Sequence, residues 1–181
     1  NVDGTNPRRL TNDKFAELQP QWSPDGKTIA FATDRGDKTD LDILKFGLWQ
    51  IGTIDVSTLR IEVIPGQDGL NLNPMWAPDS KSIAFISDRN GTPNIFLYDF
   101  DAQKHYQLTK VVGAIGAITE YSPAITWARQ ADKLAFTYYD NGDYTVWSVA
   151  NPRRLKKDPY VAPARPVVAA APAPPVNTPL P

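Results

Sequence analysis

Short runs of alternating apolar and polar residues recur along residues 13–155, and they have the period of β-strands. The three clearest runs are "TIAFAT" (28–33), "SIAFIS" (82–87) and "KLAFTY" (133–138), which are rich in β-branched and aromatic residues. Each run follows a segment that favours a tight turn. Ser23-Pro24-Asp25-Gly26 is the clearest of these, with proline at the second and glycine at the fourth position of a type I turn.

The runs belong to a longer repeat that tryptophan marks. Trp22, Trp76 and Trp127 lie 54 and 51 residues apart, and each is followed nine residues later by phenylalanine. Third strands are expected at "LWQIGTID", "NIFLYDF" and "YTVWSV", and fourth strands at "RIEVIP" and "HYQLTK". Such a period predicts four-stranded antiparallel meanders that stack radially as the blades of a β-propeller. We expect the three tryptophans to pack between blades, and Arg35 and Arg89 to tie blades together.

Several motifs support a resemblance to a known family. "DGTNPRRLTN" at 3–12, P-x-W-S/A-P-D at 20–25 and 74–79, and IAF-x-S/T-D-R at 29–35 and 83–89 resemble the TolB-type β-propeller repeat. The resemblance covers roughly residues 1–155. The predicted fold is therefore all-β, a partial β-propeller of four-stranded antiparallel blades, followed by an extended Pro/Ala-rich C-terminal tail at residues 156–181.

The number of blades predicts an incomplete ring. Residues 13–66, 67–110 and 111–155 supply three blades and residues 1–12 the end of a preceding one, whereas closed propellers have about 4–8. "NPRRL" occurs at 6–10 and again at 151–155, and we expect a partial fourth strand in both places. Three readings fit this count: a fragment of a six-bladed protein, half of a two-chain ring, or a subunit whose edges other subunits cover. The first and third readings are favoured.

The composition of the chain argues against several classes of function. A formal net charge of −1 argues against a nucleic-acid partner, because such proteins carry an excess of Lys and Arg. The 181 residues include no cysteine, which excludes disulfides and thiolate chemistry, and no apolar window is long enough to span a membrane. The chain begins at Asn1 without a signal-peptide pattern, which a processed start or missing upstream residues would both explain.

Catalytic chemistry is not indicated by the sequence. His105 is the single histidine and is expected to be an exposed residue of an outermost strand, so a Ser-His-Asp triad cannot be assembled. A Gly-x-Ser-x-Gly motif, a phosphate-binding glycine loop and a two-histidine metal pair are also missing. The sequence therefore predicts no catalytic, cofactor-binding or metal-binding residues, and no cofactor.

Two loops depart from the repeat. The first, around "GDKTDLDILKFG", has about ten extra residues and carries Asp34, Asp37, Asp40 and Asp42. Its spacing is not that of a calcium loop, so a solvated acidic loop is expected. The second, residues 111–122, is apolar from Val111 to Ile118. It is predicted either to pack back on the propeller or to form a contact surface for a partner.

The tail has eight prolines in its last 24 residues, which favours an extended polyproline-like chain. It is expected either to be a linker or to lie against the surface of a partner protein. Together with the second loop it supplies the residues predicted to contact partners, namely Val111, Val112, Ile115, Ile118, Tyr160, Arg165 and Val167.

The sequence favours a non-catalytic protein-interaction module. The resemblance implies a periplasmic location and docking to other envelope proteins, and the tail suggests an accessory or stabilising subunit of a larger envelope or membrane-associated complex. Two alternatives remain open. The blades could belong to the propeller that precedes the hydrolase domain of a prolyl-oligopeptidase-like serine peptidase, or to a sugar-binding propeller.

Overall fold

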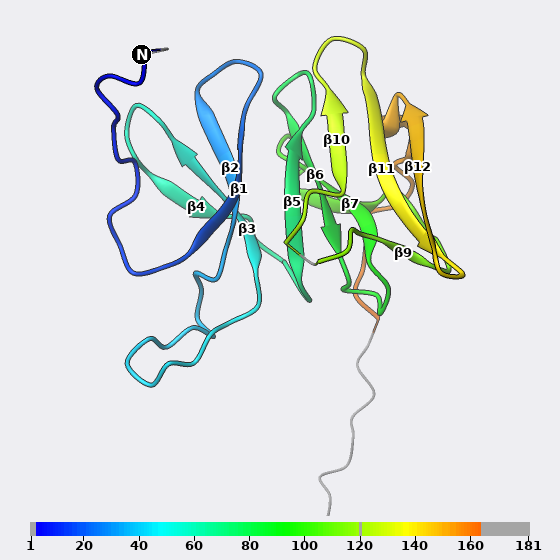
Figure 1. The fold of residues 1–181 in the computed structure, drawn as a ribbon, viewed down its shortest axis with the longest axis horizontal. Helices are drawn as coiled ribbons and strands as arrows, with labels where there is room; N and C mark the ends of the chain where they lie inside the picture. The colour runs from blue at the N-terminus through cyan, green and yellow to red at the C-terminus, as the bar shows by residue number, and fades with distance from the viewer. Residues whose placement is uncertain (1–2, 120, 164–181) are drawn as a thin grey trace, which may run out of the picture.

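Three four-stranded antiparallel sheets lie side by side in the computed structural model, which describes residues 3–119 and 121–163 (Figure 1). This arrangement confirms the predicted all-β propeller fold. Blade 1 contains β1 (Glu17–Trp22), β2 (Thr28–Thr33), β3 (Gln50–Asp55) and β4 (Ile61–Val63). Blade 2 contains β5 (Asn71–Trp76), β6 (Ser82–Ser87), β7 (Asn94–Asp99) and β8 (Lys104–Gln107). Blade 3 contains β9 (Ala114–Ile115), β10 (Ile125–Ala128), β11 (Lys133–Asp140) and β12 (Asp143–Ala150).

The turns between the first two strands of each blade define one end of the molecule, which we call the turn end. In blade 1, Gly26 donates its N–H to the Ser23 carbonyl over 2.9 Å and has a φ of 71°. Ser80 takes the same place in blade 2 with a φ of 59°. The left-handed conformation explains why glycine is preferred at this position.

The innermost strands of blades 1 and 2 each contain a β-bulge at the same place in the repeat. Gln19 in β1 and Asn73 in β5 have φ values of 55° and 56°, and the pairing register with the next strand shifts there. In blade 3 the corresponding point holds the longer segment 116–124, with β9 before it and β10 after it, and both of these strands pair with β11. The apolar insertion therefore replaces a bulge.

The blades are joined by two apolar cores. Trp76 of blade 2 packs in a cluster with Ala30, Ala32 and Ile51 of blade 1. Trp127 of blade 3 packs in the same way with Ala77 and Ala84 of blade 2. Both tryptophans are buried, which agrees with their predicted place between blades.

Trp22 holds the equivalent position in blade 1 but is 46% exposed. Its face of the sheet carries a small cluster of Ile29, Phe31 and Ile54, with Leu10 packed against it. Among the described residues no further strand covers this face, so Trp22 lacks the neighbouring blade that its two counterparts have.

The two "NPRRL" segments are not strands, and the prediction of partial strands was wrong. Pro152–Leu155 form a short 3₁₀ helix, η1, at the turn end, while residues 6–10 are irregular. Asn6 and Asn151 both have left-handed backbone conformations, with φ values of 55° and 50°. The following proline lacks an N–H group, so the segment can neither continue the preceding strand nor complete a ladder.

The packing of Trp76 and Trp22 predicts unequal costs of substitution. Trp76→Ala should lower the free energy of unfolding by about 3–5 kcal/mol, because it leaves a cavity between two blades. Trp22→Ala should cost only about 1 kcal/mol, because nearly half of that side chain is already in water. Urea unfolding followed by circular dichroism measures both values, and equal costs would contradict the proposed difference.

Candidate functional site

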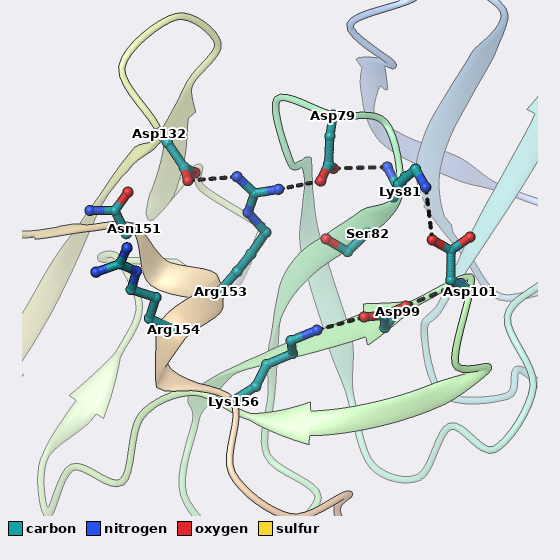
Figure 2. A pocket seen from close by; sticks show the side chains of 10 residues that line it. All are labelled: Asp79, Lys81, Ser82, Asp99, Asp101, Asp132, Asn151, Arg153, Arg154 and Lys156. Carbon is teal, nitrogen blue, oxygen red and sulfur yellow. Dashed lines mark hydrogen bonds and ion pairs between the residues drawn. The ribbon is translucent and has the colours of Figure 1, made fainter.

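A charged pocket of about 460 Å³ lies at the turn end, where blades 2 and 3 meet η1 (Figure 2). Its lining combines four basic and four acidic side chains. The basic ones are Lys81, Arg153, Arg154 and Lys156, and the acidic ones are Asp79, Asp99, Asp101 and Asp132. The pocket thus holds balanced charge.

Arg153 joins two blades through this pocket. Its Nη2 atom lies 2.6 Å from Oδ2 of Asp132 in blade 3, and its Nη1 atom donates to Asp79 in blade 2. The hydrogen bond to Asp132 is the main reason that the pKa of Arg153 is raised. Because Asp79 and Asp132 belong to the turns of neighbouring blades, the guanidinium group acts as a clamp between them.

Lys156 and Lys81 occupy two more of the carboxylates. Lys156 Nζ lies 2.7 Å from Asp99 Oδ2, and Lys81 Nζ lies 3.0 Å from Asp101 Oδ2. Burial alone would raise the pKa of Asp99, but the hydrogen bond from Lys156 and those from the backbone lower it overall. All four carboxylates of the pocket are therefore ion-paired, and the arrangement is suited to holding blades together.

Sequence reasoning missed this clamp. Both partners were visible in the sequence. Arg153 lies in "NPRRL", directly after a strand that Asn-Pro ends, and Asp79 lies in one of the predicted turns. The contact between them spans 74 residues, so local patterns could not pair them.

The opposite end of the molecule, which we call the insertion end, carries the long loop between β2 and β3 (Figure 1). The expected solvated acidic loop is confirmed for Asp37, Asp40 and Asp42, which are exposed, but not for Asp34. Asp34 is buried and accepts the N–H of Ala16 over 2.9 Å, so this carboxylate helps to fix the blade. The large apolar side chains that the loop also exposes to solvent are Ile43, Leu44, Phe46 and Leu48.

The second insertion, residues 111–122, reaches the same end. The rings of Tyr121 and Trp49 meet edge to face with centroids 6.0 Å apart, and Gln19 Nε2 donates to the Tyr121 carbonyl over 2.9 Å. Val112 and Ile118 are 97% and 86% exposed. We define the apolar rim as the exposed side chains Ile43, Leu44, Phe46, Leu48, Val112 and Ile118.

The other predicted contact residues lie elsewhere. Ile115 is fully buried in the core between blades 2 and 3, so its assignment as a surface contact was wrong; β9 pairs with β11 and turns the side chain inward. Val111 is half-buried and donates its N–H to Asn94 Oδ1 over 3.0 Å. Arg165 and Val167 lie outside the described residues.

Tyr160 contacts the chain's own blade 2. Its N–H donates to the His105 carbonyl over 2.7 Å, and its ring meets Phe96 edge to face at 5.2 Å. The segment from Lys156 to Tyr160 therefore lies along the outer side of blade 2, starting from the Asp99 ion pair.

His105 is buried, and the expectation that it would be exposed was wrong. Its Nε2 atom lies 2.7 Å from the Pro65 carbonyl oxygen, and Phe85 and Tyr98 pack against the imidazole ring. Burial is the main cause that lowers the pKa of His105 to about 4; the Pro65 carbonyl opposes this shift and Arg89 adds to it. The neutral ring serves as part of the core.

Arg35 and Arg89 bond mainly within their own blades, which corrects the expected link between blades. Arg35 pairs with Asp13 and Glu17, at 3.0 and 2.6 Å. Arg89 donates to Asn71 Oδ1 over 2.8 Å and lies over the rings of Phe96 and Phe85. Burial lowers the pKa of Arg89 to about 10. Asn71, the residue that Arg89 contacts, makes a link between blades 1 and 2, because its N–H donates to the Trp49 carbonyl over 2.9 Å.

Within residues 3–119 and 121–163, no three side chains of His, Asp or Glu gather in a way that could hold a metal ion. The same part of the chain contains no helix with the length and apolar character needed to cross a membrane. The polar groups described so far connect strands, turns and blades.

Comparisons with known proteins point to one family. No protein-family profile matches the sequence. The Tol-Pal system protein TolB of Anaeromyxobacter dehalogenans is 32% identical over 119 residues, which is 64% of this chain and 26% of that protein. That of Ruthia magnifica is 27% identical over 59% of this chain and 23% of that protein. The chain thus spans about a quarter of the length of these relatives.

Solved structures also include a TolB protein with a similar fold. TolB from Acinetobacter baumannii superposes with a TM-score of 0.57 and 26% identity, over 76% of this chain and 30% of that one. A puromycin hydrolase has a TM-score of 0.61 over 86% of this chain and 23% of its own, but only 19% identity, so it shares the fold alone.

The Arg153 clamp predicts a stability effect that a neighbouring arginine lacks. Arg153→Met should lower the free energy of unfolding by about 1–2 kcal/mol, because two partly buried pairs are lost together. Arg154→Met, the matched control on the same helix, should change it by less than about 0.5 kcal/mol. Urea unfolding at low and at about 1 M salt measures both variants. The Arg153 effect should shrink at high salt, and equal effects of the two variants would rule out the clamp.

The burial of His105 predicts a loss of stability in mild acid. Its pKa of about 4 in the folded chain lies below the ordinary value of 6.5, so between these values the unfolded chain binds a proton that the folded chain does not. Stability should therefore fall by roughly 2–3 kcal/mol as pH drops from 6.5 to 4. His105→Phe should remove this part of the pH dependence. If urea unfolding gives parallel pH profiles for both proteins, the imidazole is not held neutral.

Proposed function

Because this chain belongs to the TolB-like β-propeller repeat family, we propose that it is a non-catalytic protein-interaction module of the bacterial envelope. Its role would be that of an accessory or stabilising subunit of a larger envelope or membrane-associated complex in the periplasm. The partners would be other protein subunits, and the curated relatives, named for the Tol-Pal system, make proteins of that system the first to test.

The apolar rim is the observation that carries this proposal. Two insertions from different blades bring exposed aliphatic and aromatic side chains to the same end of the molecule. Large exposed apolar groups are costly in water and commonly mark protein contact surfaces. Carboxylates and lysines of the first loop, such as Asp42 and Lys45, would form a polar edge around it.

Paired contacts support the non-catalytic part of the proposal. The carboxylates of the charged pocket are held in ion pairs, and His105 is buried with a low pKa, which leaves it unsuited to proton transfer near neutral pH. These groups hold the fold and would present the rim on a rigid support.

A binding experiment with defined proteins tests this role. The full chain would be titrated by calorimetry with the purified protein Pal, after which the Tol-Pal system is named. The variant Ile43→Ser/Phe46→Ser should weaken binding at least 30-fold, since central apolar contacts contribute about 2 kcal/mol or more. Val146→Ser, which changes an equally exposed apolar residue on β12, serves as the control and should weaken it less than threefold.

The outcomes separate clearly. Loss of binding in the rim variant alone supports the proposal. No measurable binding of Pal to the unchanged chain, or the same loss in both variants, would overturn the assignment of the rim as its contact surface.

A further inference from the structure

A second cavity, of about 240 Å³, lies beside the bulge of β5 near the insertion end. Its walls are mainly aliphatic and come from both blades, with Leu72 and Ile86 from blade 2 and Ala117 from the segment that replaces the bulge in blade 3. The volume is below that of sites for drug-sized ligands and suits a single side chain with its adjoining backbone.

Asn73, one of the residues that line this cavity, has an unsatisfied polar atom. Its side chain lines the cavity and is 2% exposed. Oδ1 accepts the N–H of Ala124 over 2.8 Å, which fixes the orientation of the amide. Nδ2 is then buried and has no hydrogen-bond partner among the described residues. Leaving a buried donor without a partner is destabilising, so the site favours a ligand that brings an acceptor.

The preceding repeat shows which acceptor fits. Gln19 holds the equivalent place in β1, and its Oε1 accepts the N–H of Asn73 over 2.7 Å. Its Nε2 donates to a backbone carbonyl, that of Tyr121, over 2.9 Å. The side-chain amide of Asn73, at the equivalent position of the next blade, has no carbonyl oxygen in the described part of the chain to which its Nδ2 donates. A peptide carbonyl is therefore the acceptor that this repeat position is built to take.

Asp88 adds a second polar group to the cavity wall. Its Oδ1 atom accepts the Leu70 N–H over 2.7 Å, which holds the carboxylate in place. A carboxylate has further acceptor capacity and can take the N–H of the same peptide that Asn73 binds through its carbonyl.

We propose that this cavity binds one branched aliphatic residue of a peptide segment, with its backbone carbonyl on Asn73 Nδ2 and its side chain against Leu72, Ile86 and Ala117. The identification of the ligand as a segment of a partner protein rests on the proposed function. The affinity of the cavity for this chemistry can be tested without any partner.

The probe is N-acetyl-leucine N-methylamide, titrated into the ¹⁵N-labelled full chain and followed by NMR. Saturable shifts should occur at the Asn73 side-chain amide and the Ala117 backbone, with a dissociation constant of the order of 1 mM for a ligand of this size. N-acetyl-glycine N-methylamide has the same backbone groups and lacks the aliphatic side chain, so it should bind at least tenfold more weakly.

Two variants on the same segment give a matched pair. Gly116 lines the cavity, and a Cβ added there meets nothing within 4 Å. Gly116→Leu should therefore fill the cavity and weaken the binding of the leucine probe at least tenfold. Ile118→Ala lies two residues further on, in the apolar rim, and should leave the affinity within twofold while weakening a partner that binds the rim.

Equal binding of the two probes, or unchanged binding to Gly116→Leu, would overturn the inference, and so would a probe-saturated crystal structure with only water on Asn73 Nδ2. If the leucine probe binds as described but Pal does not bind the chain, the cavity stands and the proposed function fails. If Pal binds through the rim and the leucine probe shows no saturable shift, the cavity inference fails by itself.

Discussion

Blades 2 and 3 each dock the tryptophan of their innermost strand onto alanines of the blade before, and the fold depends on this complementarity. In the "IAF" motif of β6, Ile83 and Phe85 face blade 1, whereas Ala84 lies in the core shared with blade 3. Alternation along a strand sends successive side chains to opposite faces. Trp76, Ile83 and Phe85 of blade 2 therefore share one close-packed core with the alanines Ala30 and Ala32 of blade 1.

This arrangement gives the stack of blades a direction, and the polar contacts follow it. At the turn end, Arg153 joins the turns of blades 2 and 3. At the bulges, Gln19 bonds to Asn73 and Asn73 to Ala124, so each amide reaches the equivalent residue of the next blade. The series of side-chain amides ends at Ala124, because alanine has no side-chain oxygen that could accept a further hydrogen bond. The apolar faces supply most of the stabilisation, while these bonds fix the angle between blades.

Local signals were enough to predict the blades. Turn residues, alternation and repeat-locked tryptophans all act within a few positions, so the sequence could place each meander. The errors concern contacts between distant segments. His105 was expected on an open edge, but the segment ending at Tyr160 covers that strand. Ile115 was assigned to the surface although its two-residue strand pairs with β11, 23 residues further along the chain.

The candidate site was harder to predict than the fold for the same reason. The apolar side chains of the first insertion were visible in "DILKFGL", but the carboxylates at positions 34, 37, 40 and 42 led to the prediction of a solvated acidic loop. Val112 and Ile118 are exposed, and their contact with a partner stays a prediction. The meeting of the two insertions, through Tyr121 and Trp49, required the three-dimensional arrangement of blades.

The bulge of the innermost strand has a consequence for how such a molecule can diversify. Blade 3 accommodates nine residues, 116–124, at a point where blades 1 and 2 have a bulge, and the ladder with β11 resumes in register on both sides. A bulge already interrupts pairing, so added length there breaks no hydrogen bond of the sheet. The bulges of blades 1 and 2 thus mark the position at which a longer segment, as in blade 3, can be inserted while the sheet pairing on both sides is kept.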